Sequence, residues 1–144
     1  CAGTFQDGDS DGVCDANDQC PGQDDALMLF MALNAPEFDI KGITAVAGNV
    51  PLSATALNIR ILADICNRVD VPLFAGAAQP ISRKLVTAEY VHGKTGIDGV
   101  DLYEPEVKLQ EQSGVDFIIQ TLTQAADNEI RSCRQQRDEY QANQ

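Results

Sequence analysis

Aspartates alternate with small residues near the beginning of the chain. Asp7, Asp9 and Asp11 are each separated by one residue, Gly12 follows them, and two more aspartates continue the acidic run. Calcium takes about six to eight hard oxygen ligands, and carboxylates on alternating residues of a glycine-bent loop can converge on one ion. The spacing is therefore typical of a calcium-binding loop, and an acidic linker without a tight site is the alternative.

Residues 7–21 also match a known repeat. They follow the pattern D-x-D-x-D-G-x-x-D-x-x-D-x-C-P at every specified position, which resembles the thrombospondin type 3 calcium repeat. Such repeats usually occur in tandem, whereas this chain has one. The resemblance implies calcium as the ion and an extracellular or cell-envelope location; without the repeat, a cytoplasmic location is expected. The ligands that it implies are Asp7, Asp9, Asp11, Asp15 and Asp18.

A second set of motifs begins where the first ends. Asp18-Gln19-Cys20-Pro21-Gly22-Gln23-Asp24-Asp25-Ala26 is followed by Gly42-Ile43-Thr44-Ala45-Val46-Ala47-Gly48-Asn49. Three shorter blocks follow in order: Asp70-Val71-Pro72, Gly76 with Pro80, and His92-Gly93 with Gly96. Together these blocks resemble the N-terminal part of the inosine/uridine-preferring nucleoside hydrolase family, over about residues 18–130.

The family resemblance implies calcium-dependent hydrolysis of the N-glycosidic bond of purine or pyrimidine ribonucleosides to base and ribose. Asp25 would be a calcium ligand, Asp24 and Asn49 would bind the ribose, and His92 would lie in a loop near the base. Such a site suits an oxocarbenium-like transition state, because a metal activates water and fixed polar groups hold the sugar. Each role has a structural alternative. The two aspartates could simply be acidic residues that stabilise a helix N-terminus, Asn49 could be a turn residue, and His92 could be an exposed loop residue.

The chain departs from the family at the water-activating position. Cys20 stands where the family has a carboxylate before Pro-Gly, and a thiol is a soft, poor calcium ligand. No catalytic residue is therefore assigned, and the chain also ends before the family's later ligands. We expect impaired hydrolysis. The rival functions are a non-catalytic extracellular calcium-binding module and an inactive homologue that binds nucleosides.

The elements that must position these residues alternate along the chain. Apolar spacing predicts a helix over 26–35, a buried strand over 40–46, a helix from Ser53 to about Arg68 and a strand over 71–75. Residues 77–112 are predicted to be rich in loops. Ser113 is predicted to cap a further helix, with four apolar residues on one side: Val115, Ile118, Ile119 and Leu122. This order predicts an α/β fold with a parallel sheet flanked by helices, in which ligands bind beyond the carboxyl ends of the strands. Those ends carry Asn49 and the loop after Ala75.

Composition divides the chain into three parts: an acidic repeat at 1–21, a partial α/β domain at 22–130 and a polar tail at 131–144. Twenty-two acidic against 10 basic residues give a net charge of −12, which makes nucleic acid an unexpected partner. No long apolar run predicts a membrane span. Cys66 is expected to be a small buried residue, Cys1, Cys14 and Cys20 could form a disulfide in an oxidising compartment, and a lipidated Cys1 is a further option. Homo-oligomers are common in the family, although no residue here demands one.

Overall fold

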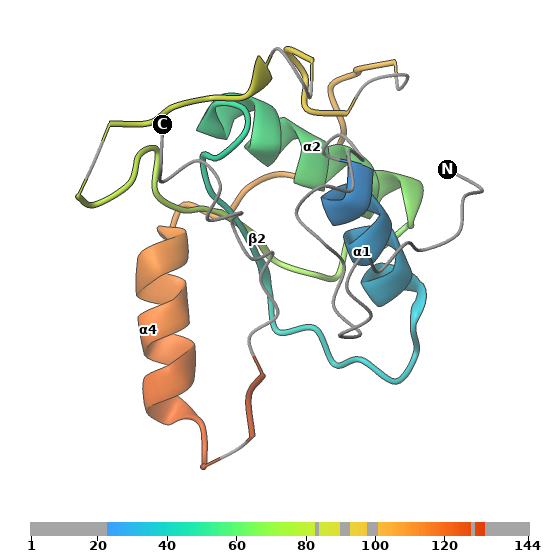
Figure 1. Cartoon of the computed structure of the whole chain (residues 1–144). Coiled ribbons are helices and arrows are strands. Elements are labelled where there is room, and N and C mark those ends of the chain that lie inside the picture. Colours follow the sequence, from blue (N-terminus) through green and yellow to red (C-terminus); the bar gives the residue numbers. More distant parts are fainter. Residues whose placement is uncertain (1–22, 83, 90–92, 98–100, 128, 132–144) are drawn as a thin grey trace, which may run out of the picture.

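The computed structural model describes residues 23–82, 84–89, 93–97, 101–127 and 129–131, and these contain a helix-flanked parallel sheet (Figure 1). The elements are α1 (Gln23–Asn34), β1 (Ile43–Ala45), α2 (Leu52–Ile65), β2 (Leu73–Ala75) and α4 (Gly114–Gln124). The predicted order of helix, strand, helix, strand and helix is confirmed, and so is the α/β class. The acidic repeat and nearly all of the tail lie outside the described residues.

The two strands pair in parallel, with Ile43 opposite Leu73 and Ala45 opposite Ala75. The far edge of β2 is partly covered, because Leu109 forms an isolated parallel bridge with Leu73 and the Gln110 amide donates to the Leu73 carbonyl at 2.8 Å. β2 therefore lies between β1 and the 106–110 segment. Both strands are shorter than predicted, since regular pairing covers only three residues of each.

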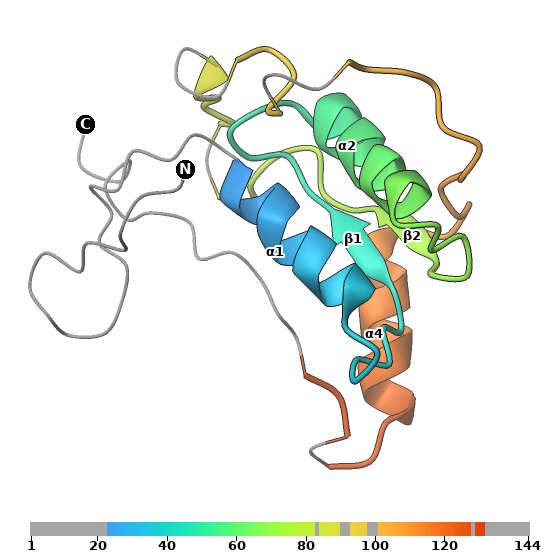
Figure 2. The same cartoon turned by 90° about the vertical axis from the view of Figure 1, so that its right-hand side faces the viewer.

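Helices cover both faces of the sheet. Figure 2 shows α1 and α2 in front of the strands and α4 behind them. On the first face the core is formed by Leu33 of α1, Ala63 of α2, Leu73 of β2 and Val107. Because successive residues of a strand point to opposite faces, Leu73 faces this core and Phe74 faces α4.

Phe74 and Phe117 form the contact between β2 and α4. Their rings stack with centroids 4.0 Å apart at an interplanar angle of 14°. Glycines allow this close approach: a Cβ on Gly42 would lie 2.6 Å from the Phe117 ring, and one on Gly114 would lie 2.2 Å from Thr44 Cγ2. Ser113 caps α4 as predicted, since its hydroxyl accepts from the Asp116 amide at 3.1 Å.

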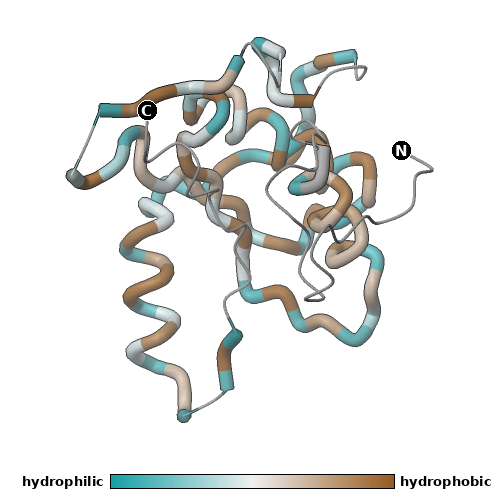
Figure 3. Tube along the Cα trace, viewed as in Figure 1, coloured by the Kyte–Doolittle hydropathy of each residue, from teal (hydrophilic) through white to brown (hydrophobic). Residues whose placement is uncertain are grey.

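The predicted apolar side of α4 does not face the sheet. Gly114, Phe117 and Thr121, at positions i, i+3 and i+7, are the residues turned inward, whereas Ile119 remains 59% exposed. Its neighbours on that side are exposed as well: Val115, Ile118 and Leu122. Helical periodicity locates an apolar stripe, but the glycine contact and the ring stack determine the rotation of the helix. Figure 3 shows several hydrophobic segments, in brown, along the trace of α4.

Two predicted details of α2 are wrong. Pro51 occupies the N-cap position without a side-chain cap, and Ser53 lies in the first turn. The helix ends at Ile65 instead of about Arg68, because Asn67 adopts a left-handed conformation with φ 53° and the Arg68 amide donates back to the Ala63 carbonyl at 2.8 Å. Cys66 is only partly buried, and its Sγ lies 3.3 Å from the donating amide of Asn34.

Two arginines hold the connecting segments in place. Arg60 of α2 donates to the carbonyls of Val107 at 2.7 Å and Pro105 at 3.0 Å, which fixes the segment beside β2. Arg68 donates to the Leu33 carbonyl at 2.7 Å and forms a two-point ion pair with Asp70 at 2.9 and 3.0 Å. The hydrogen bonds from Arg68 lower the pKa of the Asp70 carboxyl below its usual value.

We predict that Phe117→Ala lowers the free energy of unfolding by about 2–4 kcal/mol, because it removes the ring that stacks on Phe74 and leaves a cavity. Ile119→Ala on the exposed side of the same helix is the matched control and should change it by less than about 0.5 kcal/mol. Urea unfolding measures both. Equal losses in the two variants would contradict the observed rotation of α4.

The ion pair of Asp70 should make stability depend on pH. Because the pKa of Asp70 is lowered in the folded state, its contribution is present above the unfolded pKa of about 3.9 and is lost as the pH falls through the folded value. The difference in stability between the wild type and Asp70→Asn should therefore be largest near neutral pH and shrink in acid. Thermal unfolding across this range, with Asp127→Asn as the exposed control, checks the direction. A difference that grows in acid would show that the ion pair is not its source.

Candidate functional site

The carboxyl ends of β1 and β2 lie side by side. The Gly76 amide donates to the Ala45 carbonyl at 2.7 Å, and the Ala47 amide donates to the Ala77 carbonyl at 3.0 Å. These bonds continue the pairing beyond the last strand residues. The two chains therefore leave the sheet together, as predicted for the ligand-binding end of a parallel sheet.

Asn49 lies in the bend between β1 and α2. Its carbonyl accepts a hydrogen bond from the buried Ala88 amide at 2.8 Å, and the Gly48 amide donates to the Val50 carbonyl at 3.1 Å. The hydroxyl of Thr55 in α2 donates to the Val46 carbonyl at 3.0 Å. The backbone around Asn49 is thus held by hydrogen bonds from Ala88 and Thr55, while its side chain is only partly buried.

The first turn of α1 lies at the same end of the sheet. Figures 1 and 2 both place the N-terminus of α1 and the carboxyl end of β1 toward the top of the view. Asp24 and Asp25 belong to this first turn, where negative charge stabilises the helix N-terminus, and Asp25 is partly buried. The fold therefore brings Asp24, Asp25 and Asn49 to one end, although they are separated in sequence.

Other predicted site residues lie outside the described part of the chain. These are His92, Cys20 and the five aspartates of the acidic repeat, Asp7, Asp9, Asp11, Asp15 and Asp18. Their roles remain predictions.

Calcium is only partly accommodated by the residues that the structure describes. Carboxylate and amide oxygens such as those of Asp25 and Asn49 are of the chemical type that calcium prefers. Calcium needs about six to eight oxygens, however, and no group of three or more His, Cys, Asp or Glu side chains that could hold a metal occurs within the described residues. A complete calcium site would need donors from elsewhere, so we assign no metal-dependent step to these residues alone.

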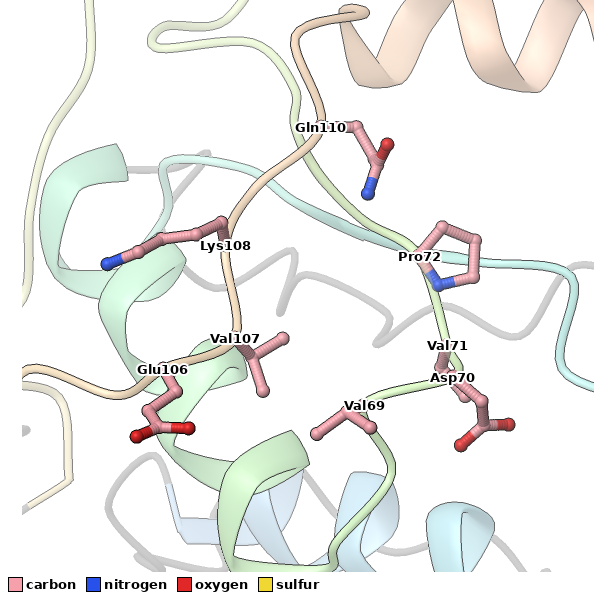
Figure 4. Close-up of a pocket in the computed structure, with 8 residues that line it drawn as sticks. All are labelled: Val69, Asp70, Val71, Pro72, Glu106, Val107, Lys108 and Gln110. Carbon is pink, nitrogen blue, oxygen red and sulfur yellow. The ribbon is translucent and has the colours of Figure 1, made fainter.

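A hollow of about 500 Å³ lies at the opposite end of β2 and was not predicted. It lies between the 69–72 turn and the 106–110 segment. Figure 4 shows Glu106 and Lys108 extending to one side and Asp70 to the other. Because these charged groups do not converge, and Asp70 is already paired with Arg68, we do not place the active site here.

Comparison with known proteins relates most of the chain to one family. Residues 16–133 match the family profile described as inosine-uridine preferring nucleoside hydrolase. An uncharacterized protein of Schizosaccharomyces pombe is 42% identical over 116 residues, which are 81% of this chain and 37% of that protein. The pyrimidine-specific ribonucleoside hydrolase RihA of Escherichia coli is 39% identical over 107 residues, which are 74% of this chain and 34% of RihA.

Solved structures agree with the sequence comparison. The plant nucleoside hydrolase PpNRh1 superposes with a TM-score of 0.65 at 30% identity, covering 72% of this chain and 33% of that one. The purine-preferring ribonucleoside hydrolase from Gardnerella vaginalis gives a TM-score of 0.62 at 23% identity, covering 72% and 34% respectively, which supports the fold alone. The chain spans about a third of the length of these relatives. Within its described residues no helix is long and apolar enough to cross a membrane.

The close approach of the strand exits predicts different effects on stability for two glycines of this region. A Cβ on Gly76 would lie 2.8 Å from the Ala45 carbonyl oxygen, whereas a Cβ on Gly48 would meet nothing within 4 Å. Gly76→Ala should therefore lower the free energy of unfolding by about 1–3 kcal/mol, because the backbone must shift, and Gly48→Ala should be nearly neutral. Chemical denaturation of both variants tests this. A cost for Gly48→Ala equal to that for Gly76→Ala would argue against the described geometry.

Proposed function

The chain belongs to the inosine-uridine preferring nucleoside hydrolase family, and we propose from this that it forms part of a calcium-linked ribonucleoside N-ribohydrolase domain. The match over residues 16–133 is the observation that carries the proposal. The reaction would be hydrolysis of the bond between base and ribose. Because the chain spans about a third of the length of its relatives, this activity is part of the proposal.

The proposed binding site is the carboxyl end of the sheet. Asp24 and Asn49 would bind ribose hydroxyls, because a carboxylate and an amide held by separate elements can fix the sugar before reaction. Asp25 would supply oxygens to calcium, and His92 would lie near the base. The arrangement of α1 and β1 supports this assignment, since the first turn of the helix and the bend that follows the strand share one end of the sheet.

Calcium, when bound, would supply a Lewis acid that lowers the pKa of a bound water. The chain's own contribution would be to orient the ribose and to hold the ion. Cys20 limits the reaction, because the position expected to take a proton from the attacking water has a thiol instead of a carboxylate. We therefore propose that nucleoside binding is retained better than turnover.

A non-catalytic extracellular calcium-binding module is the second candidate. It is favoured by the start of the family match at residue 16, which leaves the alternating aspartates Asp7, Asp9, Asp11 and Asp15 outside the match. Calorimetric titration with calcium, followed by inosine, separates the candidates. Calcium binding without any response to inosine would favour the module, and a calcium-dependent response to inosine would favour the hydrolase lineage.

A carboxylate at position 20 should strengthen calcium binding or catalysis at the second set of motifs. We predict that Cys20→Asp raises the calcium affinity or the rate of inosine hydrolysis by about tenfold or more, because one charge-assisted ligand is worth about 1.5–3 kcal/mol. Cys20→Ser is the control, since it removes the thiol without adding a charge. Calorimetry and release of the free base measure the two effects. If neither changes in Cys20→Asp, the assignment of this motif is wrong.

A further inference from the structure

Asn58 is a buried polar side chain on an otherwise apolar face of α2. It is 7% exposed and lies among the buried residues Ala56, Ile61 and Ala63. Of the residues that the structure describes, it is the only polar one in this buried class. Because transfer of an amide into an apolar environment is unfavourable unless its groups are hydrogen-bonded, an asparagine here needs an explanation.

The carboxamide of Asn58 has one hydrogen-bond partner within the described part of the chain. Its Nδ2 donates to the Thr95 carbonyl at 2.8 Å, across 37 residues of sequence, while its buried Oδ1 has no partner among the described residues. An unpartnered buried acceptor costs about 1–3 kcal/mol, so an apolar side chain of similar size would be expected to pack at least as well. Stability alone therefore does not account for an asparagine at this position. The bond to Thr95 indicates that Asn58 holds the segment around Thr95.

The segment that Asn58 holds is a tight turn against the residue next to Asn49. Gly93 and Gly96 both have left-handed backbones, with φ of 67° and 75°. A Cβ on Gly96 would lie 2.9 Å from Val50 Cγ2 and 3.4 Å from Asn58 Nδ2, so the turn packs directly on both residues. Val50 and Ile97 are buried, at 3% and 8% exposure.

The turn also lies at the end of the molecule where the candidate site is located. Figure 2 shows this part of the chain, in yellow, toward the same end as the exit of β1. The exit is also held by the bond from the Ala88 amide to the Asn49 carbonyl at 2.8 Å. Ala88 and the 93–97 turn therefore contact Asn49 and Val50 respectively.

We propose that Asn58 is a positioning residue for the ribonucleoside site. Its carboxamide anchors the Gly93–Ile97 turn against Val50. This contact fixes the bend after β1, from which the Asn49 side chain reaches the ribose. Asn58 acts through these neighbours and does not contact the substrate. The inference rests on the proposed function, because Asn49 matters here as a ribose-binding residue.

The principal test uses Asn58→Leu in the full chain. This variant removes the Thr95 bond and replaces the carboxamide with an apolar side chain of similar size, so thermal stability should be maintained or raised. Backbone amides of Thr95 to Ile97 should exchange with deuterium faster, and the affinity for inosine in the presence of calcium should fall about tenfold. Asn34→Leu is the matched control, since its amide donates to the Phe30 carbonyl at the far end of α1, and it should change neither quantity.

Gly96→Ala provides a second way to loosen the turn from Val50. It leaves Asn58 intact but forces a Cβ at positive φ toward Val50, so it should also speed exchange in the turn and weaken inosine binding. A purely structural role for Asn58 would instead lower thermal stability in Asn58→Leu with the inosine affinity unchanged. That result, or unchanged exchange at 95–97, overturns the inference.

The proposed function is tested by the wild-type chain, and the positioning role is tested by Asn58→Leu. If the wild-type chain binds no inosine with calcium, the proposed function fails and the positioning role fails with it. If the wild type binds inosine and Asn58→Leu binds equally well, the positioning role alone is overturned. Calorimetry on both proteins under the same conditions therefore distinguishes the two outcomes.

Discussion

Burial of β2 between helices on both of its faces is the constraint on which the rest of the structure depends. Leu73 is fully buried against Ala63 and Leu33 on one face, and Phe74 stacks on Phe117 on the other. The strand also has a parallel neighbour on each edge, β1 and the segment around Leu109. A short strand held from four directions gives the molecule a fixed frame, from which the loops at either end take their positions.

The candidate site follows from that frame by a simple geometric rule. In a parallel sheet all the strands end at one edge, and a helix that precedes a strand runs in the opposite direction, so its N-terminus meets the strand ends. This is why acidic residues at the start of α1 and an asparagine after β1 come to the same place. The same rule explains why the hollow beside Asp70 and Glu106 is an unconvincing active site, since it lies at the amino end.

Two helices, α1 and α4, leave apolar side chains exposed, and this chain covers about a third of the length of its relatives. α1 leaves Leu27 and Met31 exposed, and α4 leaves Ile118 and Ile119 exposed. The matched relatives have about two-thirds of their length beyond the aligned region. Apolar stripes at helical spacing are normally covered by neighbouring elements, and here the described sheet covers only one side of α4.

The sequence by itself determined the class of fold, the order of its elements and the family. Alternating apolar segments and ordered motifs are local properties, so Ser113 and the Gly42–Asn49 block could be interpreted without coordinates. The roles of Asp24, Asp25, Asn49 and His92 came from the family resemblance and stay predictions. Tertiary structure alone decided which side of α4 is inward and that Asn58 is bonded to Thr95. These depend on contacts between residues far apart in the chain, such as Gly114 with Thr44, whose strength depends on three-dimensional fit and leaves no periodic pattern in the sequence.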